Sequence, residues 1–453
     1  MNHPLAWVLA EFTFGVRGDA LPQEAVAAAR MCVLDWLGSA IAGSVTEPGR
    51  MIRNVAQMLG DGGPATLIPE GRLVPVTSAA FHNGAVSHIV ELDDLHRASI
   101  LHPGAAVIPA ALATAELVRA SGPDFLAAVV AGYEVAIRVG EAVTPSHYRY
   151  WHTTGTCGTF GAAAVSARLL GLDVGGIASA LGSAGTQAAG LWEFLADGAM
   201  SKHLHPGKAA MNGVLSALLA REGFTAASRI LEGEKGFFRA MASSYDESRV
   251  TEGLGNSYRI AGMSFKVHAS CRHTHSAIDT ALDLLRRRRP NPADITAVHV
   301  ETYQVALDVT SNSQPDSAYS AKFSLPFCVA LALCRGKAGL AEFTEGTLHD
   351  PLVRKVMGQV SLVVAPDLDA VHPAQWPARV TIWMRDGRTF TAQTDYPCGD
   401  PENPVTVSDL ERKFSDLATP VVGGLISRHL AATIGTLDTL PHVGEMTACL
   451  RKP

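Results

Sequence analysis

The spacing of apolar residues changes once along this chain, and that change constrains the fold more than any other feature. From the N-terminus to about Arg259, apolar residues recur at the spacing of amphipathic helices. After Met263, segments that alternate between apolar and polar residues, as strands do, appear between the helical ones. We therefore expect a helical first part followed by a smaller α+β part.

The first part contains six stretches with helical spacing, many of them rich in Ala on several faces. Such helices are expected inside a bundle rather than on its surface. They cover residues 23–42, 78–91, 105–119, 125–142, 161–170 and 208–221. The C-terminal stretches 408–417 and 422–434 are helical again and are expected to pack on the first part.

The second part combines both patterns. Helices are predicted over residues 276–289 and 321–334, and strands over 295–303, 360–364, 378–384 and 389–394. Asp386-Gly387 separates the last two strands, which is a strong signal for a hairpin. At 453 residues the chain suits two or three domains rather than one core.

Composition narrows the functional classes. The net charge is −6 without a long basic stretch, and the cluster Arg286–Arg289 ends a helical run, so we predict no nucleic-acid partner. Seven scattered cysteines without a CxxC pair indicate neither a disulfide framework nor a thiolate zinc site. No signal peptide is visible at the N-terminus, and apolar runs such as 104–118 are too short to span a bilayer. We predict a cytoplasmic protein without a membrane partner.

The richest polar segment runs from His82 to His96 and is followed by His102-Pro103-Gly104. Asp93 and Asp94 are predicted to lie just beyond a helix, and paired acids separate each other's pKa values in a way that suits acid–base catalysis. The alternative is a polar loop. A second alternative is a metal site at His88, Asp94 and His96, which no metal-binding spacing supports.

Two further segments favour anionic ligands. Residues 148–161 form a Thr- and Gly-rich stretch that opens a helix and suits a carboxylate, although close helix packing through small residues explains this stretch better when it is taken alone. Residues 201–210 contain two lysines and two histidines before an Ala-rich helix. Lys202 or Lys208 could hold a carboxylate or act as a base, the alternative being solvated lysines.

A fourth segment, residues 265–279, lies where the helical part meets the α+β part. Arg272 suits bidentate binding of a carboxylate. Cys271 could be a nucleophile, but no catalytic signature surrounds it and a packed thiol explains it better.

In this order, the segments resemble the MmgE/PrpD family over nearly the whole chain. The series also includes Asp35-Trp36-Leu37-Gly38, Gly132-Tyr133-Glu134-Val135, Gly233-Glu234-Lys235-Gly236-Phe237, Ala321–Phe327 and Lys413-Phe414. The family includes 2-methylcitrate dehydratase, cis-aconitate decarboxylase and iminodisuccinate epimerase. These chemistries share one demand, since each adds or removes a proton at a carbon beside a carboxylate.

The resemblance implies an α+β protein with a large all-helical domain over residues 1–262 and 400–453 and a smaller α+β domain over 263–399. It also implies a cleft between the domains, a homodimer, a small carboxylate substrate, and no metal or organic cofactor. His102, His152 and Lys202 are the implied proton-transfer candidates, with Asp93 and Tyr150 beside them. The implied substrate-binding residues are Lys266, Arg272, Asp94, His96, Thr154 and Cys271.

Three positions depart from the family pattern. Leu95 stands where the decarboxylase and the methylcitrate dehydratase tend to have Thr, Cys271 where the decarboxylase has a histidine, and Phe327 where the family has a tyrosine. These departures favour an epimerase-like reaction over decarboxylation of cis-aconitate, with His152 or Tyr150 facing Lys202 across the reacting carbon. The alternatives are a dehydratase acting on a hydroxy-polycarboxylate, a metal-dependent hydrolase, and a helical scaffold without catalysis.

Overall fold

The structure is a computed structural model that describes residues 3–451, and the chain folds into two compact units. The larger unit comprises the residues up to Ile89, Asp93–Met263 and Thr406 onward, and the smaller comprises Val90–Leu92 and Ser264–Val405. The boundaries between the units therefore fall between residues 263 and 264 and between 405 and 406. The expected domain boundaries were between 262 and 263 and between 399 and 400. The assignment of Val90–Leu92 to the smaller unit was not anticipated.

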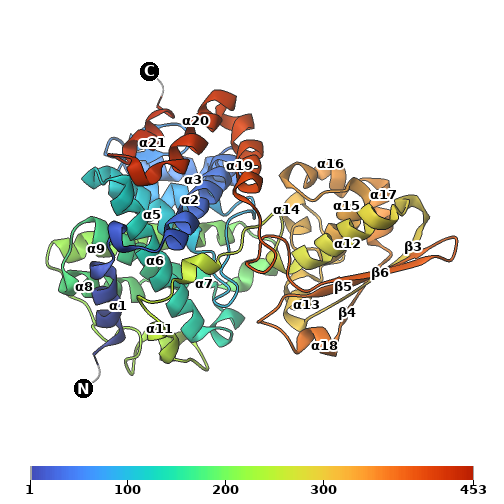
Figure 1. The fold of residues 1–453 in the computed structure, drawn as a ribbon, viewed down its shortest axis with the longest axis horizontal. Helices are drawn as coiled ribbons and strands as arrows, with labels where there is room; N and C mark the ends of the chain where they lie inside the picture. The colour runs from blue at the N-terminus through green and yellow to red at the C-terminus, as the bar shows by residue number, and fades with distance from the viewer. Residues whose placement is uncertain (1–2, 452–453) are drawn as a thin grey trace. The chain divides into compact units, whose positions relative to one another are not determined.

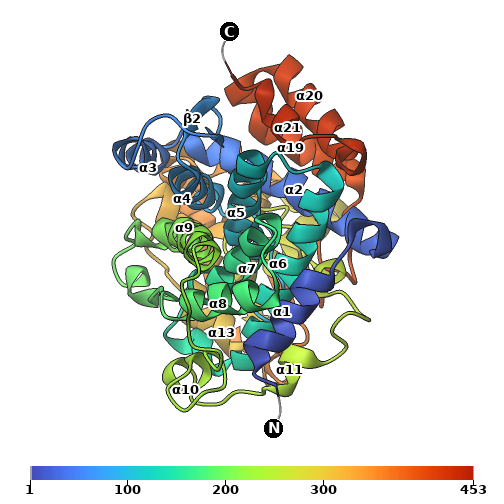
Figure 2. The same ribbon diagram turned by 90° about the vertical axis from the view of Figure 1, so that its left-hand side faces the viewer.

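Four helices form the centre of the larger unit, namely α5 (Pro103–Val118), α6 (Gly122–Val143), α7 (Thr153–Leu169) and α9 (Ser201–Arg221). Helix α7 packs against the other three (Figure 2). A Cβ atom added to Gly161 of α7 would lie 2.5 Å from the carbonyl oxygen of Gly132 on α6, so only glycine permits this approach. Close packing brings together the helix ends that carry the candidate site.

The remaining helices surround this centre (Figures 1 and 2). They are α1 (Leu5–Gly15), α2 (Gln23–Ser44), α3 (Glu47–Met58), α4 (Val76–Ser87), α8 (Val174–Gly185), α10 (Phe237–Met241), α11 (Ser248–Thr251), α19 (Val407–Val422), α20 (Gly424–Gly435) and α21 (Gly444–Ala448). The C-terminal α19 packs on α2, where Lys413 Nζ lies 2.6 Å from Asp35 Oδ1. Both ends of the chain thus contribute to one unit.

Helix α2 is long and apolar enough to cross a membrane by length and composition alone. However, 72% of its most apolar window is buried inside the structure. A buried helix of this kind is typical of a protein core, and the same test identifies no other such helix among the described residues.

The larger unit is not all-helical, contrary to the expectation. Residues Ala65–Leu67 (β1) and Arg72–Val74 (β2) pair as a short antiparallel hairpin. Strands of three residues are too short for an alternating pattern to reveal them.

Three helix boundaries also differ from the expectation, and all three affect the candidate site. Helix α4 ends at Ser87, so Asp93 and Asp94 lie several residues beyond it and outside the reach of its dipole. Helix α7 begins at Thr153 rather than at the predicted residue 161, so most of the Thr- and Gly-rich stretch is helical. Helix α9 begins at Ser201, so Lys202 lies in its first turn rather than before it.

The smaller unit contains a four-stranded mixed sheet in the order β4-β3-β5-β6. Strand β3 (Ile295–Thr302) is parallel to β4 (Val360–Val364) and antiparallel to β5 (Ala378–Met384), which continues through the predicted hairpin into β6 (Thr389–Thr394). Alternate residues of β5 are buried, as expected of a strand with one face on a core. The α+β class is thereby confirmed.

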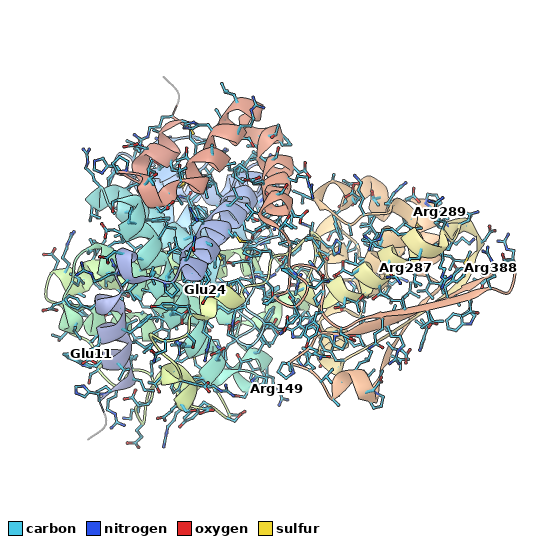
Figure 3. All side chains as sticks on the ribbon, viewed as in Figure 1. Glu11, Glu24, Arg149, Arg287, Arg289 and Arg388 are labelled. Carbon is cyan, nitrogen blue, oxygen red and sulfur yellow. The ribbon has the colours of Figure 1, made fainter. Side chains whose placement is uncertain are left out.

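Helices of the smaller unit pack on this sheet, with α12 (His275–Arg288) and α15 (Leu325–Arg335) on one face (Figure 1). The other helices are α13 (Gln304–Thr310), α14 (Ala318–Ala321), α16 (Glu345–Leu348), α17 (Pro351–Met357) and α18 (Pro366–Asp369). The arginine cluster at the end of α12 is exposed (Figure 3). Arg287 pairs with Asp283 one turn earlier, which fits a structural role.

Candidate active site

Helix ends of the larger unit bring four histidines together. His88 is the C-cap of α4, His102 the N-cap of α5 and His152 the N-cap of α7, while His205 lies on α9. All four side chains are buried. We call His88, His102, His152 and His205, together with Asp93, the histidine group.

The rings of this group are in contact. The ring of His88 lies 4.9 Å from that of His102 and 5.4 Å from that of His152, measured between centroids. His152 in turn lies 5.2 Å from His205. Two of the predicted proton-transfer residues, His102 and His152, therefore share one environment.

A hydrogen bond determines which ring nitrogen of His102 carries the proton. Its Nδ1 atom lies 2.6 Å from the carbonyl oxygen of Asp94 and 3.4 Å from Asp93 Oδ2. A carbonyl oxygen can only accept a hydrogen bond, so Nδ1 carries the proton. The Nε2 atom of neutral His102 then holds the lone pair and is the basic nitrogen.

Asp93 joins two histidines. His88 Nδ1 lies 2.7 Å from Asp93 Oδ2, the same oxygen that faces His102. The Nε2 atom of His88 is buried and has no hydrogen-bond partner among the described residues. His88 was not among the site residues predicted from the sequence, where it was considered only as a metal ligand.

His152 and His205 form a pair with their Nδ1 atoms 3.0 Å apart. Burial lowers the pKa of His152 well below its usual value, and the neighbouring His205, His88, Lys202 and His102 lower it further. Burial also lowers the pKa of His205 to about 4. Both rings are therefore neutral at physiological pH, and a neutral imidazole can accept a proton.

Lys202 lies close enough to this pair to affect it electrostatically. It is 3% exposed and lies in the first turn of α9, and its charge contributes to the lowered pKa values of His152 and His205. The structure thus places all three predicted proton-transfer residues, His102, His152 and Lys202, in one region of the larger unit.

The other predicted site residues of the larger unit differ in how close they lie to the histidine group. Thr154 Oγ1 accepts a hydrogen bond from the backbone N–H of His102 at 3.2 Å, which fits a role in holding that residue. His96 is directed elsewhere, with Nδ1 3.0 Å from Ser99 Oγ and Nε2 4.0 Å from Glu141. Tyr150 has a 60% exposed side chain that lies under the guanidinium of Arg149, so it is not part of the buried group.

Asp94 was predicted to bind the substrate, but in the structure its carboxyl group has two partners within the protein. Its Oδ2 accepts a hydrogen bond from Tyr133 at 2.7 Å, and its Oδ1 accepts one from the N–H of Gly104 at 3.1 Å. Burial and the neighbouring Asp35 and Asp93 raise its pKa to about 8, although these hydrogen bonds oppose the shift. The carboxyl groups of Asp94 and its neighbour Asp93 therefore have different partners.

In the smaller unit, Lys266 is buried and faces a carboxylate. Its Nζ atom lies 3.4 Å from Glu91 Oε2, and the hydroxyl of Tyr319 lies 3.5 Å from the other oxygen of Glu91. Glu91 adopts a positive φ of 59°, which is uncommon for a residue with a side chain. Lys322 donates to the carbonyl oxygen of the preceding Val90 at 2.9 Å. Together these contacts hold the Val90–Leu92 segment.

Arg272 fits the predicted role of a substrate binder poorly. Its guanidinium forms a buried ion pair with Asp400 and donates to the carbonyl oxygen of Cys398 at 3.1 Å. These partners occupy the Nη atoms of the guanidinium, whereas Nε is buried and has no hydrogen-bond partner among the described residues. Cys271 is buried, and its backbone N–H donates to the carbonyl oxygen of Lys322 at 2.9 Å, consistent with a packed thiol.

A metal ion, if one bound, would be held by a different set of residues from the one considered from the sequence. Among residues 3–451, the only cluster of three candidate ligands is His88, Asp93 and His102, whose ligand atoms lie within 4.8 Å of one another. Asp94 and His96 are turned toward other partners. The Nδ1 atoms of His88 and His102 are engaged in hydrogen bonds. This arrangement suits proton transfer better than metal binding.

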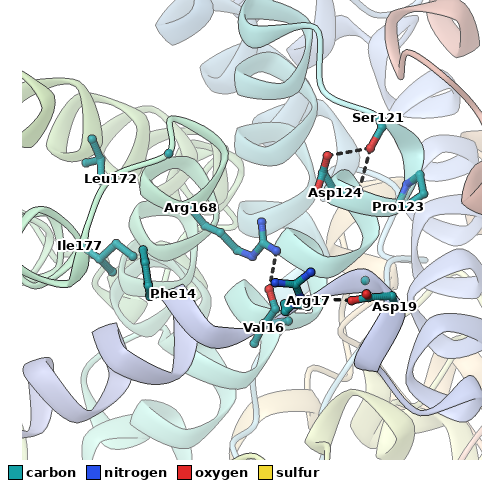
Figure 4. A pocket seen from close by; sticks show the side chains of 12 residues that line it. Phe14, Val16, Arg17, Asp19, Ser121, Pro123, Asp124, Arg168, Leu172 and Ile177 are labelled. Carbon is teal, nitrogen blue, oxygen red and sulfur yellow. Dashed lines mark hydrogen bonds and ion pairs between the residues drawn. The ribbon is translucent and has the colours of Figure 1, made fainter.

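A cavity of about 530 Å³ lies elsewhere in the larger unit (Figure 4). Arg17 and Arg168 line it, but Arg17 faces Asp19, and Arg168 donates to the carbonyl oxygen of Val16. None of the lining residues belongs to the histidine group.

The family of the chain follows from comparison with known sequences. The MmgE/PrpD N-terminal domain matches residues 8–249, and the MmgE/PrpD C-terminal domain matches residues 268–436. The chain belongs to the MmgE/PrpD family. The two matched ranges meet close to the boundary between the two structural units.

Members of the MmgE/PrpD family that resemble this chain include named enzymes. The chain is 28% identical to the cis-aconitate decarboxylase-like protein oryM of Aspergillus oryzae, over 95% of this chain and 94% of that protein. It is 28% identical to the cis-aconitate decarboxylase of Aspergillus terreus, over 96% of this chain and 93% of that protein. It is 26% identical to the cis-aconitate decarboxylase of Homo sapiens, over 97% of this chain and 93% of that protein. These relatives are lyases by name.

Proposed function

We propose that this protein is a cofactor-independent lyase that moves a proton at a carbon beside a carboxylate of a small di- or tricarboxylate. The observation that carries the proposal is the contact between His102 Nδ1 and the carbonyl oxygen of Asp94, which makes Nε2 of His102 a base within the histidine group. A base whose tautomer is fixed before the substrate arrives needs no reorganisation in the transition state.

The surroundings support carbanion chemistry. Removing a proton beside a carboxylate places negative charge on the carbon and the carboxylate, and a nearby cation lowers the free energy of that state. Lys202 supplies such a charge beside His152 and His205. The lowered pKa of His152 keeps its imidazole neutral, so the ring can exchange hydrogen bonds with a substrate, although the same shift makes it a weaker base than an ordinary histidine.

Within the lyases, we propose dehydration of a hydroxy-polycarboxylate of the 2-methylcitrate type. A base takes the proton from the carbon beside the carboxylate, and the hydroxyl group on the adjacent carbon leaves with a second proton as water. The named relatives are lyases, which supports this class over the epimerase-like reaction that the sequence favoured.

Decarboxylation of cis-aconitate is the second candidate, because the relatives from Aspergillus terreus and Homo sapiens are named cis-aconitate decarboxylases. Cys271 weighs against it, because the decarboxylase has a histidine at this position, and the buried thiol of Cys271 is a weak hydrogen-bond donor.

We also propose that the protein is cytoplasmic and, as the family resemblance implies, a homodimer. Light scattering coupled to size-exclusion chromatography measures the oligomeric state directly. A mass of one 47.7 kDa chain would contradict it.

The reaction can be tested with a panel of substrates in deuterated water. Hydroxy-tricarboxylates should yield ultraviolet absorbance from a new conjugated double bond. Carbon dioxide released from cis-aconitate would identify the decarboxylase instead, and a new stereoisomer of iminodisuccinate containing solvent deuterium would identify the epimerase. Absence of all three signals from folded protein would overturn the proposal.

A further inference from the structure

Asp94 accepts three hydrogen bonds, one from His102 itself and two from helices beside it. Its backbone carbonyl oxygen lies 2.6 Å from His102 Nδ1. Its carboxyl oxygens accept from the Tyr133 hydroxyl on α6 at 2.7 Å and from the Gly104 N–H on α5 at 3.1 Å. The side chain is 1% exposed and that of Tyr133 is fully buried. One residue therefore joins the ring of His102 to two helices.

The contact with Gly104 caps helix α5. His102 is the N-cap of this helix, and its own side chain makes no capping hydrogen bond. The N-terminal N–H groups of a helix need acceptors from elsewhere, such as a side-chain oxygen. Asp94 supplies the acceptor, so the same residue holds both the ring of His102 and the helix that begins beside it.

The space around this contact permits no side chain on Gly104. A Cβ atom there would lie 2.7 Å from the Tyr133 hydroxyl oxygen and 2.8 and 2.9 Å from the two carboxyl oxygens of Asp94. The glycine therefore allows α5 to approach the carboxyl group closely enough for a hydrogen bond.

We infer that Asp94 is a positioning residue for His102, and that Tyr133 in turn holds the side chain of Asp94 in place. The backbone carbonyl of Asp94 holds the proton of His102 on Nδ1, and the carboxyl group, fixed by Tyr133 and Gly104, holds that carbonyl in place. The inference rests on the proposed function, in which Nε2 of His102 is the base. It also explains why the carboxyl group of Asp94 is not a substrate binder.

The tautomer of His102 provides a test that does not depend on turnover. Nitrogen chemical shifts of ¹⁵N-histidine-labelled protein distinguish an imidazole protonated at Nδ1 from one protonated at Nε2, and the His102→Asn variant identifies the signal that belongs to His102. The unaltered protein is expected to show the Nδ1-protonated form. Tyr133→Phe and Asp94→Ala are expected to show a mixture of both forms.

Kinetics provide the second readout. In Tyr133→Phe, kcat is expected to fall about tenfold with KM nearly unchanged, because a positioned base acts in the chemical step. Asp94→Asn retains an oxygen that can accept from Tyr133 and should lose less activity than Asp94→Ala. Tyr303→Phe, which removes a buried hydroxyl that lies 2.7 Å from His273 Nδ1 in the smaller unit, is the matched control and should leave kcat unchanged.

The outcomes separate this inference from the proposed function. If no substrate is converted but the tautomer changes as expected in the variants, the proposed function fails and the positioning role stands. If His102 is protonated at Nε2 in the unaltered protein, or keeps its Nδ1-protonated form in Asp94→Ala, the inference is overturned. Equal losses of activity in folded Asp94→Asn and Asp94→Ala would also overturn it, because the oxygen that accepts from Tyr133 would then make no difference.

Discussion

The Nδ1 atom of His152 lies 3.0 Å from the Nδ1 atom of His205. Both rings are neutral at physiological pH because burial lowers their pKa values, so one Nδ1 must donate and the other accept. The two histidines consequently adopt opposite tautomers, and a change in one alters the other.

Replacing His205 should therefore change the pH dependence of the reaction. His205 is one of the groups that lower the pKa of His152, so His205→Gln should raise that pKa. His152 acts in its neutral form, and the acid limb of the plot of kcat/KM against pH should move to higher pH. An acid limb at its original position would contradict this assignment.

His147 provides the matched control for that measurement. It is also a buried histidine, but its nitrogens contact the carbonyl oxygen of Met241 at 2.9 Å and Thr156 Oγ1 at 2.8 Å. His147→Gln should lower the midpoint of thermal unfolding and leave the acid limb in place.

The close approach at Gly104 predicts a localised steric effect. Gly104→Ala should displace Asp94 and Tyr133, because its Cβ would lie within 3 Å of both. We expect lower thermal stability and an activity loss of about tenfold or more, since the acceptor for His102 would shift. Gly435→Ala, where a Cβ would meet no atom within 4 Å, is the control. Equal activity in the two variants would show that Asp94 is not held as described.

Arg272 should behave as a stabilising residue rather than as a substrate binder. Its ion pair with Asp400 is buried on both sides, and removing one partner of such a pair typically costs about 3–5 kcal/mol. Arg272→Gln should lower the free energy of unfolding in urea by this order. The exposed pair of Arg335 with Asp350 is the control, and Arg335→Gln should cost less than about 1 kcal/mol. A raised KM with unchanged stability in Arg272→Gln would instead support substrate binding.

The buried histidines predict sensitivity to acid. Burial lowers the pKa of His82 and His147 to about 4 and that of His96 and His273 to about 3, from an ordinary value of 6.5. Below pH 6.5 the unfolded chain therefore binds protons that the folded chain does not, and the free energy of unfolding falls as the pH falls toward 4.

Asp94 acts in the opposite direction, because its raised pKa makes the folded chain bind a proton more readily than the unfolded chain. Glu116 and Glu134, whose pKa values burial also raises, act in the same direction as Asp94. The histidines with lowered pKa values are more numerous, because His152, His205, His275 and His372 join the four above, so the net effect should be destabilisation by acid. Thermal unfolding midpoints at pH 7, 6 and 5 should fall in that order. A constant or rising midpoint would contradict the prediction.

The sequence predicted the strands of the smaller unit well because their apolar residues alternate. Strands β4, β5 and β6 begin and end at the predicted residues. The start of α7 could not be predicted in the same way, since its first turns lack apolar spacing. There, threonine hydroxyls bond back to carbonyls one turn earlier, as Thr159 does with Gly155 at 2.9 Å, and so satisfy their polar groups within the helix.

The candidate site was predicted only in part. His102, His152 and Lys202 stand in family motifs, and those motifs identified them. His88 and His205 stand in the same motifs, but their importance depends on contacts with Asp93 and His152 that form only in the folded chain. The side chains of Asp94 and Arg272 have the chemistry of substrate binders. In the folded chain, however, Asp94 accepts a hydrogen bond from Tyr133, and Arg272 forms an ion pair with Asp400.

Solvent deuterium exchange in the His102→Asn variant tests the central claim most directly. The asparagine amide can place an N–H near the position of Nδ1 for the Asp94 carbonyl and removes the basic Nε2. With a hydroxy-tricarboxylate in deuterated water, the unaltered protein should exchange the hydrogen beside the carboxylate, and the variant should exchange it at least about a hundredfold more slowly. Exchange by the folded variant at the original rate would contradict the assignment of His102 as the base.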